Sequence, residues 1–167
     1  MFVPEELFKD FKKKGVPVEC VYCCDMSGNH TCPELFENEF ILLKADQSSK
    51  KTQLGRVEKG MIRKLDYRKA ATYGVSPRNV GQYFLQEALM QSAEKAPLVI
   101  VKGMAGTSKT FYSLAVGLEK LLNNPSGEYW RILICRPNAL FDSDIGFIPG
   151  DEQEKISPLM RPIMDNL

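Results

Sequence analysis

The stretch Pro97 to Leu118, PLVIVKGMAGTSKTFYSLAVGL, decides how the chain is expected to fold. Apolar residues precede Lys102, small residues follow it, and apolar residues with helical spacing come next. A second short apolar run, RILIC at 131–135, follows the predicted helix, and such runs are typical of buried parallel strands. We therefore predict strand, loop, helix over about 107–123, and a second, parallel strand joined to the first by a right-handed crossover.

The small residues between strand and helix match the phosphate-loop pattern G-x-x-x-x-G-K-[ST], except that Ser108 stands before the lysine. In such a loop, backbone N–H groups at a helix N-terminus bind phosphate, the lysine reaches the β- and γ-phosphates, and the next hydroxyl binds Mg²⁺. The alternative is a turn of small residues beside an exposed lysine. The residues predicted to bind nucleotide, with Thr110 also on Mg²⁺, are Gly103, Met104, Ala105, Gly106, Thr107, Ser108, Lys109 and Thr110.

The serine matters because glycine lets the backbone pass close to a phosphate without a Cβ in the way. If φ at Ser108 is negative, the replacement costs little. If φ is positive, the strain is on the order of 1 kcal/mol or more. We expect the serine to be tolerated in a weakened nucleotide site.

Composition limits the classes of function. The chain has 167 residues, of which 44% are hydrophobic and 26% charged, as expected for a globular protein with one modest core. A net charge of +1 gives no overall attraction for a polyanion, so any surface for nucleic acid must be local. The sequence contains no apolar run of the ~20 residues that a membrane span needs, which favours a cytoplasmic protein.

The first third is predicted to be small and β-rich. A strand is expected over 39–45, a polar loop over 47–51, and a hairpin whose turn is Glu58-Lys59-Gly60. The character changes at Ser76, where a helix is predicted to lead into the apolar run before the loop. We therefore divide the chain into a β-rich region, 1–75, and a nucleotide-binding region, 76–167.

Four cysteines and the only histidine gather within 13 residues. This composition would suit tetrahedral zinc, with the candidate ligands Cys20, Cys23, His30 and Cys32. The spacing between them is unusually short. Buried cysteines in a strand are the alternative, because free cysteine packs as a small hydrophobe.

A second signature begins at the end of the second predicted strand, in the stretch 131–167, RILICRPNALFDSDIGFIPGDEQEKISPLMRPIMDNL. Together with GMAGTSKT, this sequence closely resembles the PhoH family of P-loop ATPases. The matching positions are Arg136-Pro137, Gly146 to Asp151, Glu154-Lys155, Pro158 and Arg161-Pro162. The resemblance implies an α/β fold, namely part of a P-loop NTPase of the RecA or helicase-like type with parallel strands, preceded by the small β-rich segment.

The resemblance continues upstream, where residues 38–89 look like the linker that joins a PIN nuclease domain to the ATPase in one branch of the family. It implies ATP and Mg²⁺ as ligands, coupling to RNA with helicase-like activity, and adenine recognition by Gln82. Arg136 would contact nucleic acid or support the phosphate site. No catalytic residue is assigned, and assembly into a homo-oligomer stays open.

The sequence lacks the apolar strand ending in acidic residues that such ATPases place after the second strand, and it has no room for a PIN fold. We therefore expect a fragment consisting of the linker and the first part of the ATPase, which binds ATP and hydrolyses it slowly or not at all. Two alternatives remain open. The chain could be a non-enzymatic remnant, or its first third could be a small zinc-dependent RNA-binding module.

Overall fold

A computed structural model describes residues 1–25, 27–46, 48–123 and 127–135. The chain divides into two compact units, which are described separately below. The sheet unit contains Met1–Ala70 and Pro77–Glu87, and the loop unit contains Ala71–Ser76 and the residues from Ala88 onward. The helices and strands are β1 (Phe2–Val3), α1 (Glu5–Lys14), β2 (Val16–Pro17), a 3₁₀ turn (Val18–Cys20), β3 (Cys23–Cys24), β4 (His30–Thr31), β5 (Phe40–Ala45), β6 (Ser48–Glu58), β7 (Met61–Lys64), α2 (Val80–Met90) and α3 (Lys109–Leu122).

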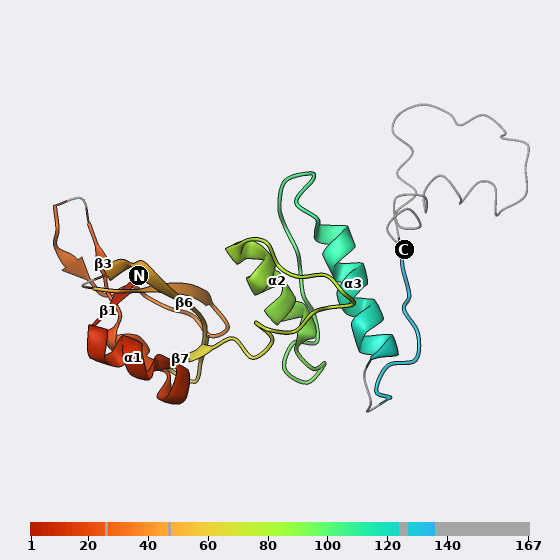
Figure 1. The fold of residues 1–167 in the computed structure, drawn as a ribbon, viewed down its shortest axis with the longest axis horizontal. Helices are drawn as coiled ribbons and strands as arrows, with labels where there is room; N and C mark the ends of the chain where they lie inside the picture. The colour runs from red at the N-terminus through yellow and green to blue at the C-terminus, as the bar shows by residue number, and fades with distance from the viewer. Residues whose placement is uncertain (26, 47, 124–126, 136–167) are drawn as a thin grey trace, which may run out of the picture. The chain divides into compact units, whose positions relative to one another are not determined.

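The sheet unit is built on a five-stranded sheet in the order β1-β5-β6-β7-β2. Figure 1 labels three of these strands, β1, β6 and β7. The edge strand β1 runs parallel to β5, and the other neighbouring strands are antiparallel. β3 and β4 form a separate two-stranded hairpin. Strands and helices are therefore combined in one chain, which confirms the α/β class and the β-rich first third.

Helix α1 packs on this sheet because its two buried phenylalanines, Phe8 and Phe11, join the core formed by alternate residues of β5. Strand β7 and this helix together leave Gly55 no room for a side chain. A Cβ there would lie 2.7 Å from Ile62 Cγ2, 2.9 Å from the Arg63 carbonyl oxygen and 3.0 Å from Phe11 Cζ. Fully burying a large apolar side chain contributes about 1.5–3 kcal/mol, so this small core accounts for much of the unit's stability.

Two of the local predictions for the first third are confirmed. The strand expected over 39–45 is β5, and the expected hairpin joins β6 to β7. Both turn residues have positive φ, 52° at Lys59 and 73° at Gly60, as a tight two-residue hairpin turn requires. The prediction of a polar loop over 47–51 is wrong, because β6 begins at Ser48 and pairs with the end of β5.

Helix α1 is an element that the sequence analysis missed. It has acidic residues, Glu5 and Glu6, in its first turn and three lysines in its last turn. These charges complement the helix dipole, and the spacing of Phe8 and Phe11 places both on one face. These two signals were present in the sequence.

The loop unit contains α3, whose apolar face is buried, and this confirms the helix predicted after the phosphate-loop pattern. The buried residues are Tyr112, Leu114, Ala115 and Val116. Two polar contacts fasten the end of α3. The Glu119 carboxylate accepts the Tyr73 N–H at 2.7 Å, and Lys120 Nζ donates to the Gln91 carbonyl at 2.7 Å. Burial lowers the pKa of Lys120.

The two strands predicted on either side of this helix are not formed. Residues 98–101 and 131–135 lie outside every strand, and Leu98, Ile100 and Leu133 are 76%, 73% and 75% exposed. A parallel strand needs neighbours that satisfy its backbone groups and cover both its faces. Among the described residues of the loop unit, no strand supplies either. None of the described helices is long and apolar enough to cross a membrane.

Candidate nucleotide site

The phosphate-loop pattern lies in a turn that ends at the first residue of α3. Residues 105 and 106 form the turn, Gly106 has φ +77°, and the helix begins at Lys109. In the described part of the chain, no backbone N–H of residues 103–108 donates to a backbone carbonyl. The first-turn N–H groups of a helix also lack partners within the helix. The loop therefore offers a series of donors beside a helix N-terminus, an arrangement suited to an anion.

The Lys109 side chain folds back over the loop that precedes it. Its ammonium group donates to the Met104 carbonyl oxygen at 2.5 Å and to Thr107 Oγ1 at 3.2 Å. The Thr107 hydroxyl in turn donates to the same carbonyl at 2.8 Å. The ammonium group of the half-buried Lys109 thus connects two residues of the loop, Met104 and Thr107.

Gly103 is at the base of this closed loop. A Cβ at Gly103 would lie 3.3 Å from Thr107 Oγ1 and 3.6 Å from Lys109 Cδ. The first distance is tighter than ordinary van der Waals contact, so a side chain here would require the Thr107 hydroxyl to shift slightly, whereas the second is an ordinary contact. Glycine at the first position of the pattern leaves the Thr107 hydroxyl undisturbed.

Ser108 adopts the left-handed conformation, with φ 61° and ψ 23°, immediately before the helix. Its side chain makes no capping hydrogen bond to α3. The sequence leaves the sign of φ at Ser108 open, and the structure shows that it is positive. In this conformation a Cβ destabilises the backbone by about 1 kcal/mol or more. The serine is therefore strained where glycine would not be.

Thr110 is exposed in the first turn of α3, one residue after Lys109. In this position its hydroxyl is open to solvent at the same helix end as the loop donors. A hydroxyl and water molecules are ligands that Mg²⁺ accepts. The structure thus brings residues 103–110 together in one loop and one helix turn.

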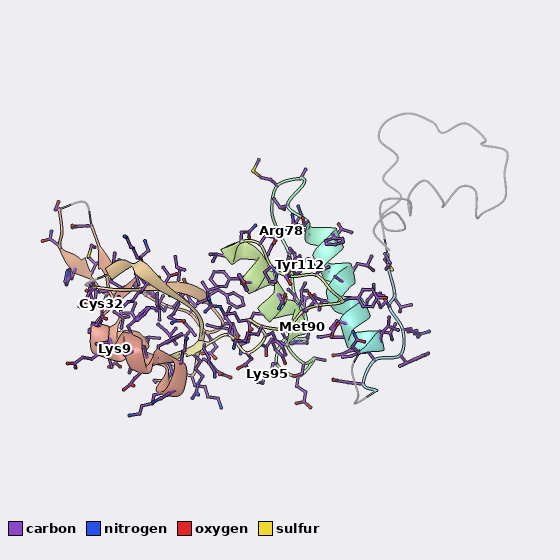
Figure 2. All side chains as sticks on the ribbon, viewed as in Figure 1. Lys9, Cys32, Arg78, Met90, Lys95 and Tyr112 are labelled. Atoms are coloured by element: carbon purple, nitrogen blue, oxygen red, sulfur yellow. The ribbon has the colours of Figure 1, made fainter. Side chains whose placement is uncertain are left out.

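Gln82 belongs to the sheet unit, where it takes part in the N-terminal cap of α2. Its N–H donates to Asn79 Oδ1 at 2.9 Å, and its side-chain Oε1 accepts the Arg78 N–H at 2.8 Å (Arg78 is labelled in Figure 2). This reciprocal pattern resembles a capping box. The capping role is a structural alternative to adenine recognition, and the Oε1 atom retains a second lone pair.

Several predicted residues fall outside the described part of the chain. Arg136 and the rest of the second signature, up to Arg161-Pro162, lie in the segment 136–167. The role predicted for Arg136 therefore stays a prediction.

The cysteine cluster is not assembled as a metal site in the described residues, where no three His, Cys, Asp or Glu side chains come close enough to hold an ion. In the hairpin, Cys23 pairs with Thr31 and Cys24 pairs with His30. Because successive strand residues face opposite sides, Cys23 and His30 point to different faces. The His30 ring stacks on Tyr22, with ring centroids 4.3 Å apart.

Sequence reasoning also missed a buried polar pair, Gln86 and Glu87, which are 0% and 1% exposed in α2. The Glu87 carboxylate accepts the N–H groups of Asp66 and Tyr67 at 3.1 and 2.8 Å. Burial raises the pKa of Glu87, although these two hydrogen bonds and the nearby Arg56 oppose the increase. Polar residues at consecutive helix positions gave no signal of burial, because each would ordinarily face solvent.

Comparison with known proteins identifies the chain's relatives. The profile of the family described as PhoH-like protein matches residues 74–167, a range that contains the loop, α3 and Gln82. The chain belongs to the PhoH family. Among its PhoH relatives, Protein PhoH2 of Bacillus subtilis strain 168 is 32% identical over 170 aligned positions, which cover 100% of this chain and 36% of that protein.

Two further PhoH relatives match shorter parts of the chain. Protein PhoH of Escherichia coli K12 is 37% identical over 116 residues, 69% of this chain and 30% of its own. The PhoH-like protein of Synechocystis sp. PCC 6803 is 36% identical over 84 residues, 50% of this chain and 25% of its own. The chain thus spans about a third or less of the length of these relatives. No solved structure matches it.

Proposed function

We propose that residues 103–110 bind the phosphates of ATP, with Mg²⁺ held at Thr110. The observation that supports this most directly is the Lys109 ammonium group, which lies over the loop on two neutral oxygens, the Met104 carbonyl and Thr107 Oγ1. A phosphate oxygen is a stronger partner than either, because its negative charge adds the attraction between opposite charges to the hydrogen bond from the ammonium group. Phosphate would therefore draw the lysine off its own loop.

The loop backbone and helix α3 would contribute the remaining contacts. The N–H groups of 103–108 and the first turn of α3 would donate to phosphate oxygens, and the helix dipole would favour their negative charge. When bound, ATP supplies the phosphoanhydride bond and Mg²⁺ neutralises its charge. The chain's own residues bind and orient it.

Three finer parts of the proposal rest on the family resemblance. Gln82 would read adenine, Arg136 would support the phosphates or a nucleic acid, and the site would be coupled to RNA in a helicase-like protein. The division of the chain at residue 75 and assembly into a homo-oligomer belong to the same proposal. Each needs its own test.

ATP binding is tested with the full chain and a fluorescent ATP analogue in the presence of Mg²⁺. Lys109→Ala is expected to weaken binding at least tenfold, because it removes the charged partner of the phosphates. Lys102→Ala is the matched control, because it removes the same charge from an exposed position next to the loop. Equal affinity of wild type and Lys109→Ala, or equal losses in both variants, would overturn the proposal.

A further inference from the structure

The sheet unit contains an open pocket of about 690 Å³ whose lining is strongly basic. Four cationic side chains line it against one carboxylate, that of Asp66, and the cations are Lys12, Lys64, Arg68 and Lys69. All four are exposed, and none forms an ion pair within the described part of the chain. Because the whole chain has a net charge of only +1, this local excess is a distinct feature of the surface.

The pocket also contains an aromatic ring beside one of these cations. Tyr83 of α2 lines the pocket, and the Arg68 guanidinium lies 5.9 Å from the centroid of its ring. Arg68 Nη1 also donates to Gln53 Oε1 of β6 at 3.4 Å. A half-buried ring and a planar guanidinium are the two kinds of surface on which nucleic-acid bases stack.

Buried contacts hold these groups in place. The Gln86 amide donates to the Tyr67 and Ala70 carbonyls at 2.6 and 2.8 Å, and Glu87 accepts two N–H groups from the same segment. These bonds fasten the segment that carries Arg68 and Lys69 to the helix that carries Tyr83. The backbone positions of Arg68 and Lys69 are therefore held next to the helix that carries Tyr83, which lowers the entropic cost of binding.

We propose that this pocket binds single-stranded nucleic acid, with its lysines and Arg68 on the phosphates and Tyr83 stacked on a base. An acidic peptide would use the cations and leave the ring without a role. A single strand uses both, because every base has a face to stack and every linkage has a phosphate. The volume suits a ligand of about nucleotide size. The pocket lining shares no residue with 103–110, and we expect the pocket to bind without ATP.

Binding is tested by fluorescence anisotropy of the full chain with labelled oligouridylate and oligothymidylate of about 12 nucleotides, between about 50 and 200 mM salt. Up to four phosphate contacts predict a slope of log affinity against log salt of roughly −2 to −3. The double variant Lys64→Ala, Lys69→Ala should weaken binding and reduce the size of this slope by about 1.4. The control, Lys9→Ala with Lys95→Ala, removes two exposed lysines outside the pocket lining and should change neither (Figure 2).

The stacking step has its own pair of variants. Tyr83→Leu is expected to weaken binding about tenfold, whereas Tyr83→Phe retains the ring and should bind as wild type. Lys109→Ala should bind the oligonucleotides normally even where it loses ATP, so the two proposals fail separately. If Tyr83→Leu does not fold, the Phe variant and the lysine variants decide the outcome.

Three results would overturn the proposal. The first is the absence of oligonucleotide binding at about 50 mM salt. The second is binding that the pocket lysine pair and the control pair weaken equally. The third is displacement of the oligonucleotide by poly-glutamate at the same charge concentration, which would identify an acidic-peptide site instead.

Discussion

The φ angle of Ser108 determines whether serine, in place of the usual glycine, strains the phosphate loop. With φ 61°, Ser108 occupies a conformation in which an L side chain crowds its own backbone. Gly106 has a similar φ of +77° without that penalty. Gly103 has no positive φ, but a Cβ there would lie 3.3 Å from Thr107 Oγ1, which would have to shift slightly. Neighbouring small residues in one loop therefore serve different purposes.

Replacing Ser108 by glycine is expected to stabilise the chain by about 1 kcal/mol, because it removes the Cβ from a left-handed position. Ser108→Ala is the matched control, since it keeps the Cβ, loses the hydroxyl and should give no such gain. Urea unfolding of the three proteins measures the difference. The glycine variant should also bind ATP at least as tightly as wild type, and weaker binding by both variants would show that the serine hydroxyl is itself a ligand.

At the scale of elements, polar contacts hold α2 at its N-terminus and through its two buried residues. At its N-terminus, Asn79 Oδ1 accepts the Gln82 N–H and Gln82 Oε1 accepts the Arg78 N–H. Its buried Gln86 and Glu87 bind backbone groups of the segment after β7. One aromatic contact adds to these, between Phe84 and Phe40 of β5, with ring centroids 5.0 Å apart. Most of these bonds connect residues 16 to 21 positions apart, so they fasten two consecutive elements to each other.

Replacing Glu87 by glutamine is expected to change how stability depends on pH. Burial raises the pKa of Glu87 above its ordinary value of 4.5, so the folded chain retains a proton that the unfolded chain releases. The stability from this group is complete below about pH 4.5 and is lost as pH rises through the raised pKa. The cost of Glu87→Gln should therefore be larger at pH 4 than at pH 7.

The free energy of unfolding of both proteins is measured by urea denaturation at several pH values between 4 and 7. The part of the mutational cost that depends on pH amounts to about 1.4 kcal/mol for each pH unit between the pKa of Glu87 in the folded chain and its pKa in the unfolded chain. A cost that is constant with pH, or one that grows toward pH 7, would contradict the assigned direction.

At the scale of the whole molecule, the sheet unit has a core of its own, whereas the loop unit leaves large apolar side chains exposed. The described segments on either side of α3 contain most of them, including Leu98, Trp130 and Leu133, each about three-quarters exposed. Parallel strands are stable when both faces are covered, and the described residues of this unit do not cover them. The chain spans 36% of the length of Bacillus subtilis PhoH2.

The 167-residue chain is expected to bind ATP and to release phosphate much more slowly than about one per second. Turnover needs an acidic residue that holds Mg²⁺ and orients water, and residues 136–167 contain no strand-length run of apolar residues in sequence that ends in one. Phosphate release by the purified chain is measured with Lys109→Ala as control. If the chain hydrolyses ATP at about one per second or faster and Lys109→Ala abolishes this activity, a carboxylate after Arg136 holds the Mg²⁺ that hydrolysis needs.

The sequence by itself determined the features that depend on residues close together in the chain. Strand β5, the Lys59-Gly60 turn and helix α3 follow from local periodicity and turn chemistry. The phosphate-loop pattern in 103–110, together with the signature that starts at Arg136-Pro137, indicated the PhoH family. These signals act over a few residues, so no distant contact is needed to read them. Helix α1 carried a signal of the same kind that was not used.

Only the tertiary structure decided features that depend on distant residues. The basic pocket combines side chains from Lys12 to Tyr83, and Glu87 is buried because a segment 20 residues earlier covers it. The apolar runs 98–101 and 131–135 have the composition of strands and still form none, because a strand exists only by pairing with another. The composition of a segment indicates which secondary structure it can form. Whether it forms that structure depends on whether distant residues bond to its backbone and pack against its side chains.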